Sequence, residues 1–114
     1  MSKHKKGKEL LQDLFVLELA NNHLGDLDRG YNIISQYSKV VRHNKIKAAI
    51  KLQIRDVDSF IHDDFKNYKN SRYISKTILS KLSKKDYKKL SDKIISSGCI
   101  AMATPFDEQS VETC

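Results

Sequence analysis

Short apolar runs alternate with amphipathic stretches along this chain. Residues 14–20 (LFVLELA) lie between Asp13 and Asn21 and form a run too brief for a helix that must bury itself. This run predicts a buried strand. Asp26 then stands as an N-cap before apolar residues at roughly helical spacing, which predicts a helix that continues to about Arg42.

Two more strands are predicted downstream. Residues 47–54 (KAAIKLQI) alternate in polarity, so that the three large aliphatic residues share one face of a strand. A third apolar run, residues 99–103 (CIAMA), is expected to end where Pro105 prevents continued pairing. The first strand, helix and second strand form a βαβ unit, which requires parallel strands.

The segment between the second and third strands is less regular. Residues 55–82 are rich in Asp, Asn, Ser and Lys and predict a long excursion with one helical stretch around Ile78. Ser83 and Asp86 then have the spacing of a capping box, and the periodicity that follows predicts a helix to about Ser97.

The order of these elements limits the fold to two classes. Three βα units in succession indicate an α/β protein, either a doubly wound sheet or a (β/α)8 barrel. Asp107 is expected to cap a third helix, and the sequence finishes at Cys114 within that helix. A barrel needs about 250 residues, so we expect the chain to be truncated if it is a barrel.

Charge and cysteine content say more about the kind of partner and the cellular compartment than about the activity. A net charge of +7 fits an anionic partner, either nucleic acid or a small phosphorylated substrate. Lysines crowd residues 1–9 and 81–93, but no aromatic platform accompanies them, so both clusters are expected to face water. Cys99 and Cys114 form neither a disulfide framework nor a metal-binding spacing. Because no apolar stretch suits a membrane span or signal peptide, we expect a cytoplasmic protein.

Polar residues near the predicted strand ends are the candidates for chemistry, because parallel α/β folds bind ligands there. Glu18 and Lys51 stand inside predicted strands, where an ionised side chain is costly unless it is paired. They form either a structural ion pair or a site for proton transfer and anion binding. Thr104 is either a strand-ending residue or part of that site, and His23 is more often structural than a ligand.

Three segments in the same order and spacing resemble the sialic acid synthase family: LELANNHLGDL (17–27), AAIKLQ (48–53) and MATPFDEQSVE (102–112). In that family the first strand ends in glutamate followed by Asn-His-x-Gly, the second carries Lys-x-Gln, and the third ends in Thr-Pro-Phe-Asp. The resemblance covers residues 14–114 and leaves residues 1–13 as a lysine-rich tail. Leu19 and Ala20 depart from the family pattern, as does the 55–82 loop.

The resemblance implies a partial TIM barrel, of which this chain supplies the first three βα units. It also implies a condensation of phosphoenolpyruvate with an N-acetylmannosamine-like aldehyde, followed by loss of phosphate. Lys51 and Thr104 would hold the phosphoenolpyruvate anion, and Glu18 would orient or deprotonate water. The fragment alone is expected to be inactive.

Other functional groups follow from the same resemblance. Gln53 would support the lysine, while Asn22 and His23 would shape the pocket. A divalent metal, Mn or Mg, would be bound by residues outside this chain, and the full-length protein would be a homodimer.

The sequence leaves other functions open. The chain could be a non-catalytic basic binding module, a truncated remnant, or part of another phosphoenolpyruvate-condensing synthase that makes a different sugar acid. Salt-dependent binding of nucleic acid, which we do not expect, would favour the binding module.

Overall fold

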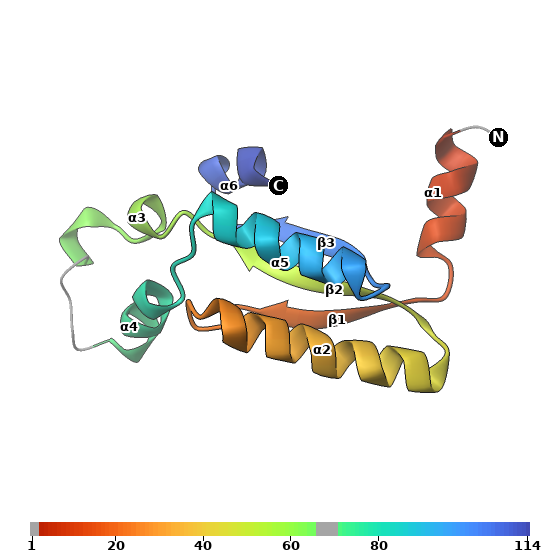
Figure 1. Cartoon of the computed structure of the whole chain (residues 1–114). Helices are drawn as coiled ribbons and strands as arrows, with labels where there is room; N and C mark the ends of the chain where they lie inside the picture. Colours follow the sequence, from red (N-terminus) through yellow and green to blue (C-terminus); the bar gives the residue numbers. More distant parts are fainter. Residues whose placement is uncertain (1–2, 66–70) are drawn as a thin grey trace.

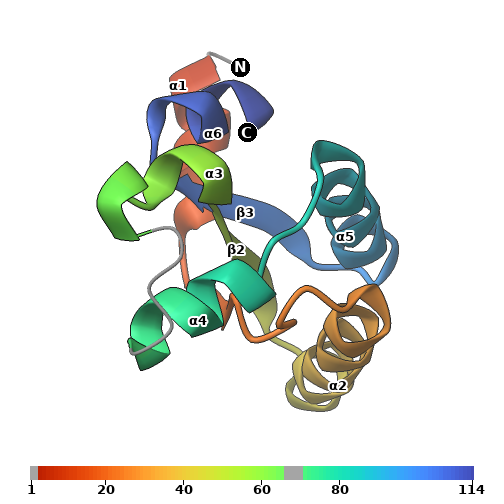
Figure 2. The same ribbon diagram turned by 90° about the vertical axis from the view of Figure 1, so that its left-hand side faces the viewer.

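The computed structural model of the protein describes residues 3–65 and 71–114 and has an α/β fold built on a parallel sheet. Its strands β1 (Leu14–Ala20), β2 (Lys47–Ile54) and β3 (Ile100–Pro105) lie in the order β1-β2-β3. Helices α2 (Leu27–Asn44) and α5 (Lys84–Ser96) lie together on one face of this sheet (Figures 1 and 2). The predicted βα order and the parallel pairing are confirmed.

The remaining elements gather at the two ends of the strands (Figure 1). Helix α1 (Lys3–Leu11) lies at the amino ends. The short helices α3 (Val57–Phe60) and α4 (Arg72–Leu79) lie at the carboxyl ends, as does α6 (Glu108–Thr113). A 3-10 turn, η1 (Asp63–Phe65), follows α3. None of the helices in the described ranges is long and apolar enough to cross a membrane.

The core forms between the sheet and its two long helices. Ile50, Leu52 and Ile54 of β2 are all buried, which confirms that they share one face. They pack with fully buried residues of the helices, among them Ile34 of α2 and Leu90 of α5. Because β2 is the central strand, its apolar face is covered along its whole length.

The first strand is less buried than its composition suggested. Of its residues only Leu19 is buried, while Phe15 and Val16 are 54% and 43% exposed. In this chain β1 is an edge strand, so it gains neighbours on one side only. The prediction of a buried strand was therefore right about its position and wrong about its burial.

The third strand is also shifted from its predicted bounds. It begins at Ile100 and includes Pro105, which stands opposite Ile54 in the register of β2 and β3. The next residue, Phe106, donates its N–H to the Ile54 carbonyl at 3.0 Å. Proline removes a single donor and can be accommodated as the last residue of a strand, so it does not end the pairing before itself.

The amino-terminal segment contains a helix. Helix α1 covers most of residues 1–13, and the Glu9 carbonyl accepts a hydrogen bond from Lys47 Nζ at 2.8 Å. Lys8 is exposed, as predicted for this lysine cluster, and the side chains of residues 1–6 lie outside the described part. The second cluster is also exposed: its lysines are Lys81, Lys84, Lys85, Lys88, Lys89 and Lys93.

Local capping signals were accurate. Ser83 and Asp86 form the predicted capping box at the start of α5, and Gly98 follows the helix with a φ of +89°. Asp26 caps α2 by accepting from the N–H groups of Asp28 and Arg29. The 55–82 excursion is more regular than expected, since it contains α3, η1 and α4.

Candidate functional site

Glu18 and Lys51 form an ion pair on the face of the sheet opposite α2 and α5. They are direct partners in the register of β1 and β2, and Lys51 Nζ lies 2.5 Å from Glu18 Oε1. The two side chains are 26% (Lys51) and 49% (Glu18) exposed. A pair this accessible to solvent contributes little stability, so both groups remain available to a ligand.

Gln53 lies two residues further along β2 and connects the strand ends. Its Oε1 atom accepts hydrogen bonds from Asn21 Nδ2 at 3.2 Å and from Arg55 Nη2 at 3.1 Å. Thr104 of β3 is the partner of Gln53 in the sheet register. The structure therefore brings Lys51, Gln53 and Thr104 to neighbouring positions near the carboxyl ends of β2 and β3.

Arg55 is a prominent side chain of this region, a strand-end residue to which the sequence assigned no role. Its guanidinium lies 4.9 Å from the centre of the Phe60 ring and 4.7 Å from that of Phe106. Two aromatic rings hold the planar group in place through cation–π contacts. Its Nε atom is buried and has no hydrogen-bond partner among the described residues.

The Asp107 carboxylate accepts hydrogen bonds from backbone N–H groups near the carboxyl end of β2. Asp107 accepts from the N–H of Asp56 and from the N–H of Ser110, both at 2.7 Å, and so links the end of β2 to the start of α6. Partial burial alone would raise the pKa of the Asp107 carboxyl, but these hydrogen bonds outweigh it and lower the pKa below its usual value.

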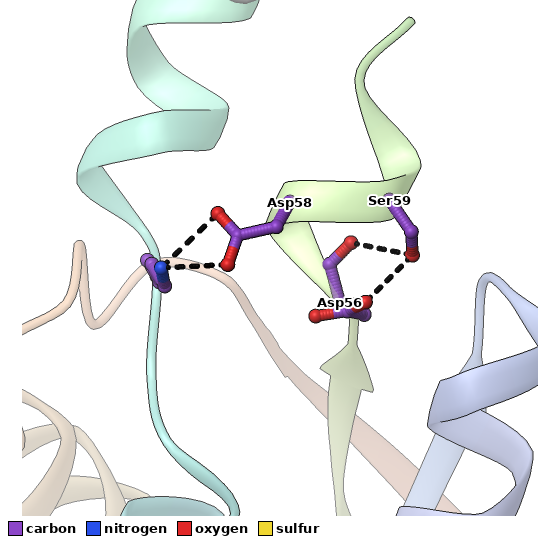
Figure 3. Close-up of polar contacts among 4 residues, drawn as sticks. Asp56, Asp58 and Ser59 are labelled. Carbon is purple, nitrogen blue, oxygen red and sulfur yellow. Dashed lines mark hydrogen bonds and ion pairs between the residues drawn. The ribbon is translucent and has the colours of Figure 1, made fainter. Parts of the chain in front are cut away.

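Figure 3 shows the carboxylates that follow β2. Asp56 accepts from the Ser59 hydroxyl at 2.7 Å, and Asp58 points the other way, where its carboxylate pairs with Lys81 at 3.0 Å. These contacts fix the turn into α3. They also occupy the acidic groups of this turn.

His23 lies apart from the Glu18–Lys51 pair. It is fully buried, its Nδ1 atom accepts from the Gly25 N–H at 2.9 Å, and its ring meets that of Tyr87 edge to face. Burial lowers the pKa of His23 to about 4, so the ring is neutral at pH 7. This environment fits the structural role favoured by the residue type, and a role in shaping the pocket stays a prediction.

A cavity of about 210 Å³ opens between the strand ends and α4. Its lining includes Asn21, Asn22, Gln53 and Arg55 from the strand ends, and Tyr73 and Lys76 from α4. We call it the strand-end cavity. Two of the predicted substrate-binding residues, Asn22 and Gln53, line it, whereas Glu18, Lys51 and Thr104 do not.

A larger hollow, of about 540 Å³, lies beside β3 and α5. It includes Leu52, Ala101 and Ala103, which belong to the helix-covered face of the sheet. Because it contains none of the predicted site residues, we do not assign it to the site.

Metal binding has no support within the described ranges. They contain no group of three or more His, Cys, Asp or Glu side chains that could hold an ion. Glu18 already faces a cation, Lys51. The side chains that the structure describes therefore do not form a metal site by themselves.

The fold and the strand-end side chains together define a parallel α/β unit with its polar groups at the carboxyl ends of the strands, and two solved proteins that resemble it are carbohydrate-biosynthesis proteins. One is a Chromobacterium violaceum protein described as spore coat polysaccharide biosynthesis protein E. It is 32% identical, with a TM-score of 0.83, and the match covers 90% of this chain.

A second neighbour is the N-acetylneuraminic acid (sialic acid) synthetase of Leptospira borgpetersenii serovar Hardjo-bovis, solved in complex with citrate. It is 21% identical with a TM-score of 0.66 over 89% of this chain, a likeness that shows the fold alone. No protein-family model matches the sequence, and no curated protein matches it. The chain spans only 30% and 31% of the lengths of the two solved proteins.

Proposed function

We propose that this chain is the N-terminal segment of a synthase that condenses phosphoenolpyruvate with an N-acetylmannosamine-like amino sugar. The observation that carries the proposal is the placement of Lys51, Gln53 and Thr104 on adjacent strands, with Glu18 paired to Lys51. Its support is the fit between this arrangement and the strand-end motifs of the sialic acid synthase family. The identity of 32% to a polysaccharide biosynthesis protein adds to that support.

In the proposed reaction, C3 of phosphoenolpyruvate forms a bond to the aldehyde carbon of the sugar, whose oxygen takes up a proton. Water then adds at C2, and the C–O bond to phosphate breaks to release inorganic phosphate. Lys51 and Thr104 would hold the anionic substrate, because a phosphate and a carboxylate need fixed cations and donors. Glu18 would exchange its contact with Lys51 for one with the attacking water and accept a proton from it.

The rest of the site would come from outside this chain. A divalent ion, Mn or Mg, would supply Lewis-acid activation of the aldehyde, and its ligands would lie in later strands of a barrel. We propose a homodimeric, cytoplasmic full-length protein. A binding module with no catalytic role remains the second candidate, favoured by the exposed lysines of α5.

The test uses the longer protein encoded in frame with this chain. Sugar-dependent release of phosphate from phosphoenolpyruvate is expected, and Glu18→Gln and Lys51→Met should each lower kcat/KM by at least about 100-fold. Lys47→Met is the matched control, because Lys47 lies on the same strand at its amino end and contacts the Glu9 carbonyl.

Either of two results would contradict the proposal. One is full activity in both site variants. The other is a stop codon directly after Cys114, with salt-dependent binding of nucleic acid by the chain itself, which would favour the binding module.

A further inference from the structure

The strand-end cavity carries uncompensated positive charge. Arg55 and Lys76 both line it, and no Asp or Glu is among the residues of its lining. In the part of the chain that the structure describes, neither cation takes part in an ion pair. A concave site with two cations and no carboxylate attracts anions.

The Arg55 guanidinium is preorganised by its contacts within the protein. The rings of Phe60 and Phe106 fix the plane of its guanidinium, and Gln53 occupies one of its five donors. The fork of donors that remains matches the geometry of a carboxylate or phosphate group. Little side-chain entropy is left to lose on binding, because the rings already hold the group.

The nearest acidic turn does not neutralise this arginine. Asp56 accepts from Ser59, and Asp58 pairs with Lys81, so both carboxylates are turned to other partners (Figure 3). Asp107 accepts from backbone N–H groups at both of its oxygens. The positive charge at the cavity is therefore a feature of the local architecture.

Further polar residues line the cavity. Asn22, which lines it, contributes its backbone carbonyl to Arg29 Nε at 2.6 Å, and this contact fixes the backbone at that point. Tyr73 and Lys76, three residues apart on α4, line the opposite side. Polar residues from two separate parts of the fold, the strand ends and α4, thus line the same cavity.

We propose that the strand-end cavity binds an oxyanion, the phosphate or carboxylate group of a small ligand, between Arg55 and Lys76. This subsite is separate from the Glu18–Lys51 pair, and it does not depend on the condensation reaction. It assigns a binding role to Arg55 and to α4, an element of the divergent 55–82 segment.

The test measures the thermal unfolding midpoint of the chain against inorganic phosphate and, separately, against acetate. Sodium chloride keeps the ionic strength constant, and size-exclusion chromatography checks that all variants have the same association state. We expect a saturable rise in the midpoint, since a ligand that binds the folded state stabilises it. A response to phosphate alone identifies a phosphoryl group, and a response to acetate identifies a carboxylate.

The variants locate the binding. Lys76→Gln should weaken the apparent Kd at least about fivefold, as expected for loss of one charged contact. Arg55→Lys, which keeps the charge and loses the fork, should weaken it as well. Arg72→Gln is the matched control: it removes the same charge from the same helix, at a residue outside the cavity lining, and should respond like the parent chain. This control also accounts for the general stabilising effect of phosphate.

Three results would overturn the inference. The midpoint could fail to respond to either anion, or Lys76→Gln and Arg72→Gln could respond equally. The response could also be lost only in Lys51→Met, which would place the anion at the Glu18–Lys51 pair and favour the proposed function over this one.

Discussion

Lys51 and Arg55 are two cations on neighbouring parts of one chain segment, yet their surroundings differ in kind. Lys51 faces a carboxylate at 2.5 Å, so its charge is balanced within the protein. Arg55 is held by two rings and an amide, none of which carries a negative charge. A substitution of Lys51 therefore exposes a bare carboxylate, whereas a substitution of Arg55 removes charge from the cavity.

His23 shows how strongly burial acts on a single titratable residue. Its pKa is lowered to about 4 because the buried ring resists the charged form. In the unfolded chain the ring of His23 has the ordinary histidine pKa of about 6.5. The contribution of neutral His23 to the free energy of unfolding is therefore complete above about pH 6.5, and it declines as the pH falls toward 4.

We expect the free energy of unfolding to fall by about 2 to 3 kcal/mol through protonation linked to His23 between pH 7 and pH 4. Urea titrations at several pH values measure this slope. His23→Asn, which keeps an acceptor near the position of Nδ1, should flatten the profile between pH 7 and pH 5. His43→Asn, at an exposed histidine, should leave it unchanged. Equal slopes in the parent chain and His23→Asn would show that His23 does not titrate in this way.

Elements that are distant in sequence meet at the turn between β1 and α2. Gly25 has a φ of +77°, and a side chain there would place its Cβ 2.3 Å from the Leu79 carbonyl oxygen at the end of α4. The turn that carries Asn22 and His23 is thus packed directly against the helix that carries Lys76. The two segments that line the strand-end cavity therefore approach each other closely at Gly25.

Gly25→Ala is therefore expected to destabilise the fold by at least about 3 kcal/mol, combining left-handed backbone strain with a steric clash. Gly98→Ala is the matched control, because Gly98 also has a positive φ, +89°, but a Cβ added to it would meet no atom within 4 Å. It should cost only about 1 to 2 kcal/mol. Chemical denaturation of both variants measures the difference, and equal losses would argue against the contact with α4.

The sequence predicted those elements whose signals are local. The bounds of β1 and β2 follow from apolar runs flanked by polar residues, and the capping box at Ser83 follows from two residues three positions apart. An ion pair between Glu18 and Lys51 was one of the two roles that the sequence left open, and the structure contains it. The proximity of Arg55 and Lys76 could not be predicted from local signals, because the packing position of α4 depends on contacts between segments distant in sequence.

On the scale of the whole molecule, helices cover one face of the sheet, and the other face carries exposed side chains. Helices α2 and α5 cover the first face (Figure 2). On the second lie Val16 and the Glu18–Lys51 pair, and β1 and β3 each have one side without a strand partner in the described sheet. Unpaired strand edges beside exposed apolar side chains favour association between chains.

We expect the 114-residue chain to self-associate at micromolar concentration, which analytical ultracentrifugation measures. Val16→Lys, on the uncovered face of an edge strand, should shift the population toward monomer. Val40→Lys is the control, since Val40 is 53% exposed on α2. A monomeric parent chain with a sharp two-state melt would contradict this expectation.

The agreement between sheet order and chain order has a consequence for synthesis on the ribosome. Each strand pairs with the one made just before it, so β2 can dock onto β1 while α5 is still being translated. That early intermediate has α2 in place, but Leu90 and Ile94, which complete the core, arrive some forty residues later. Until then Ile34 and Ile50 lack these partners, and apolar surface exposed in this way makes a nascent chain prone to aggregation.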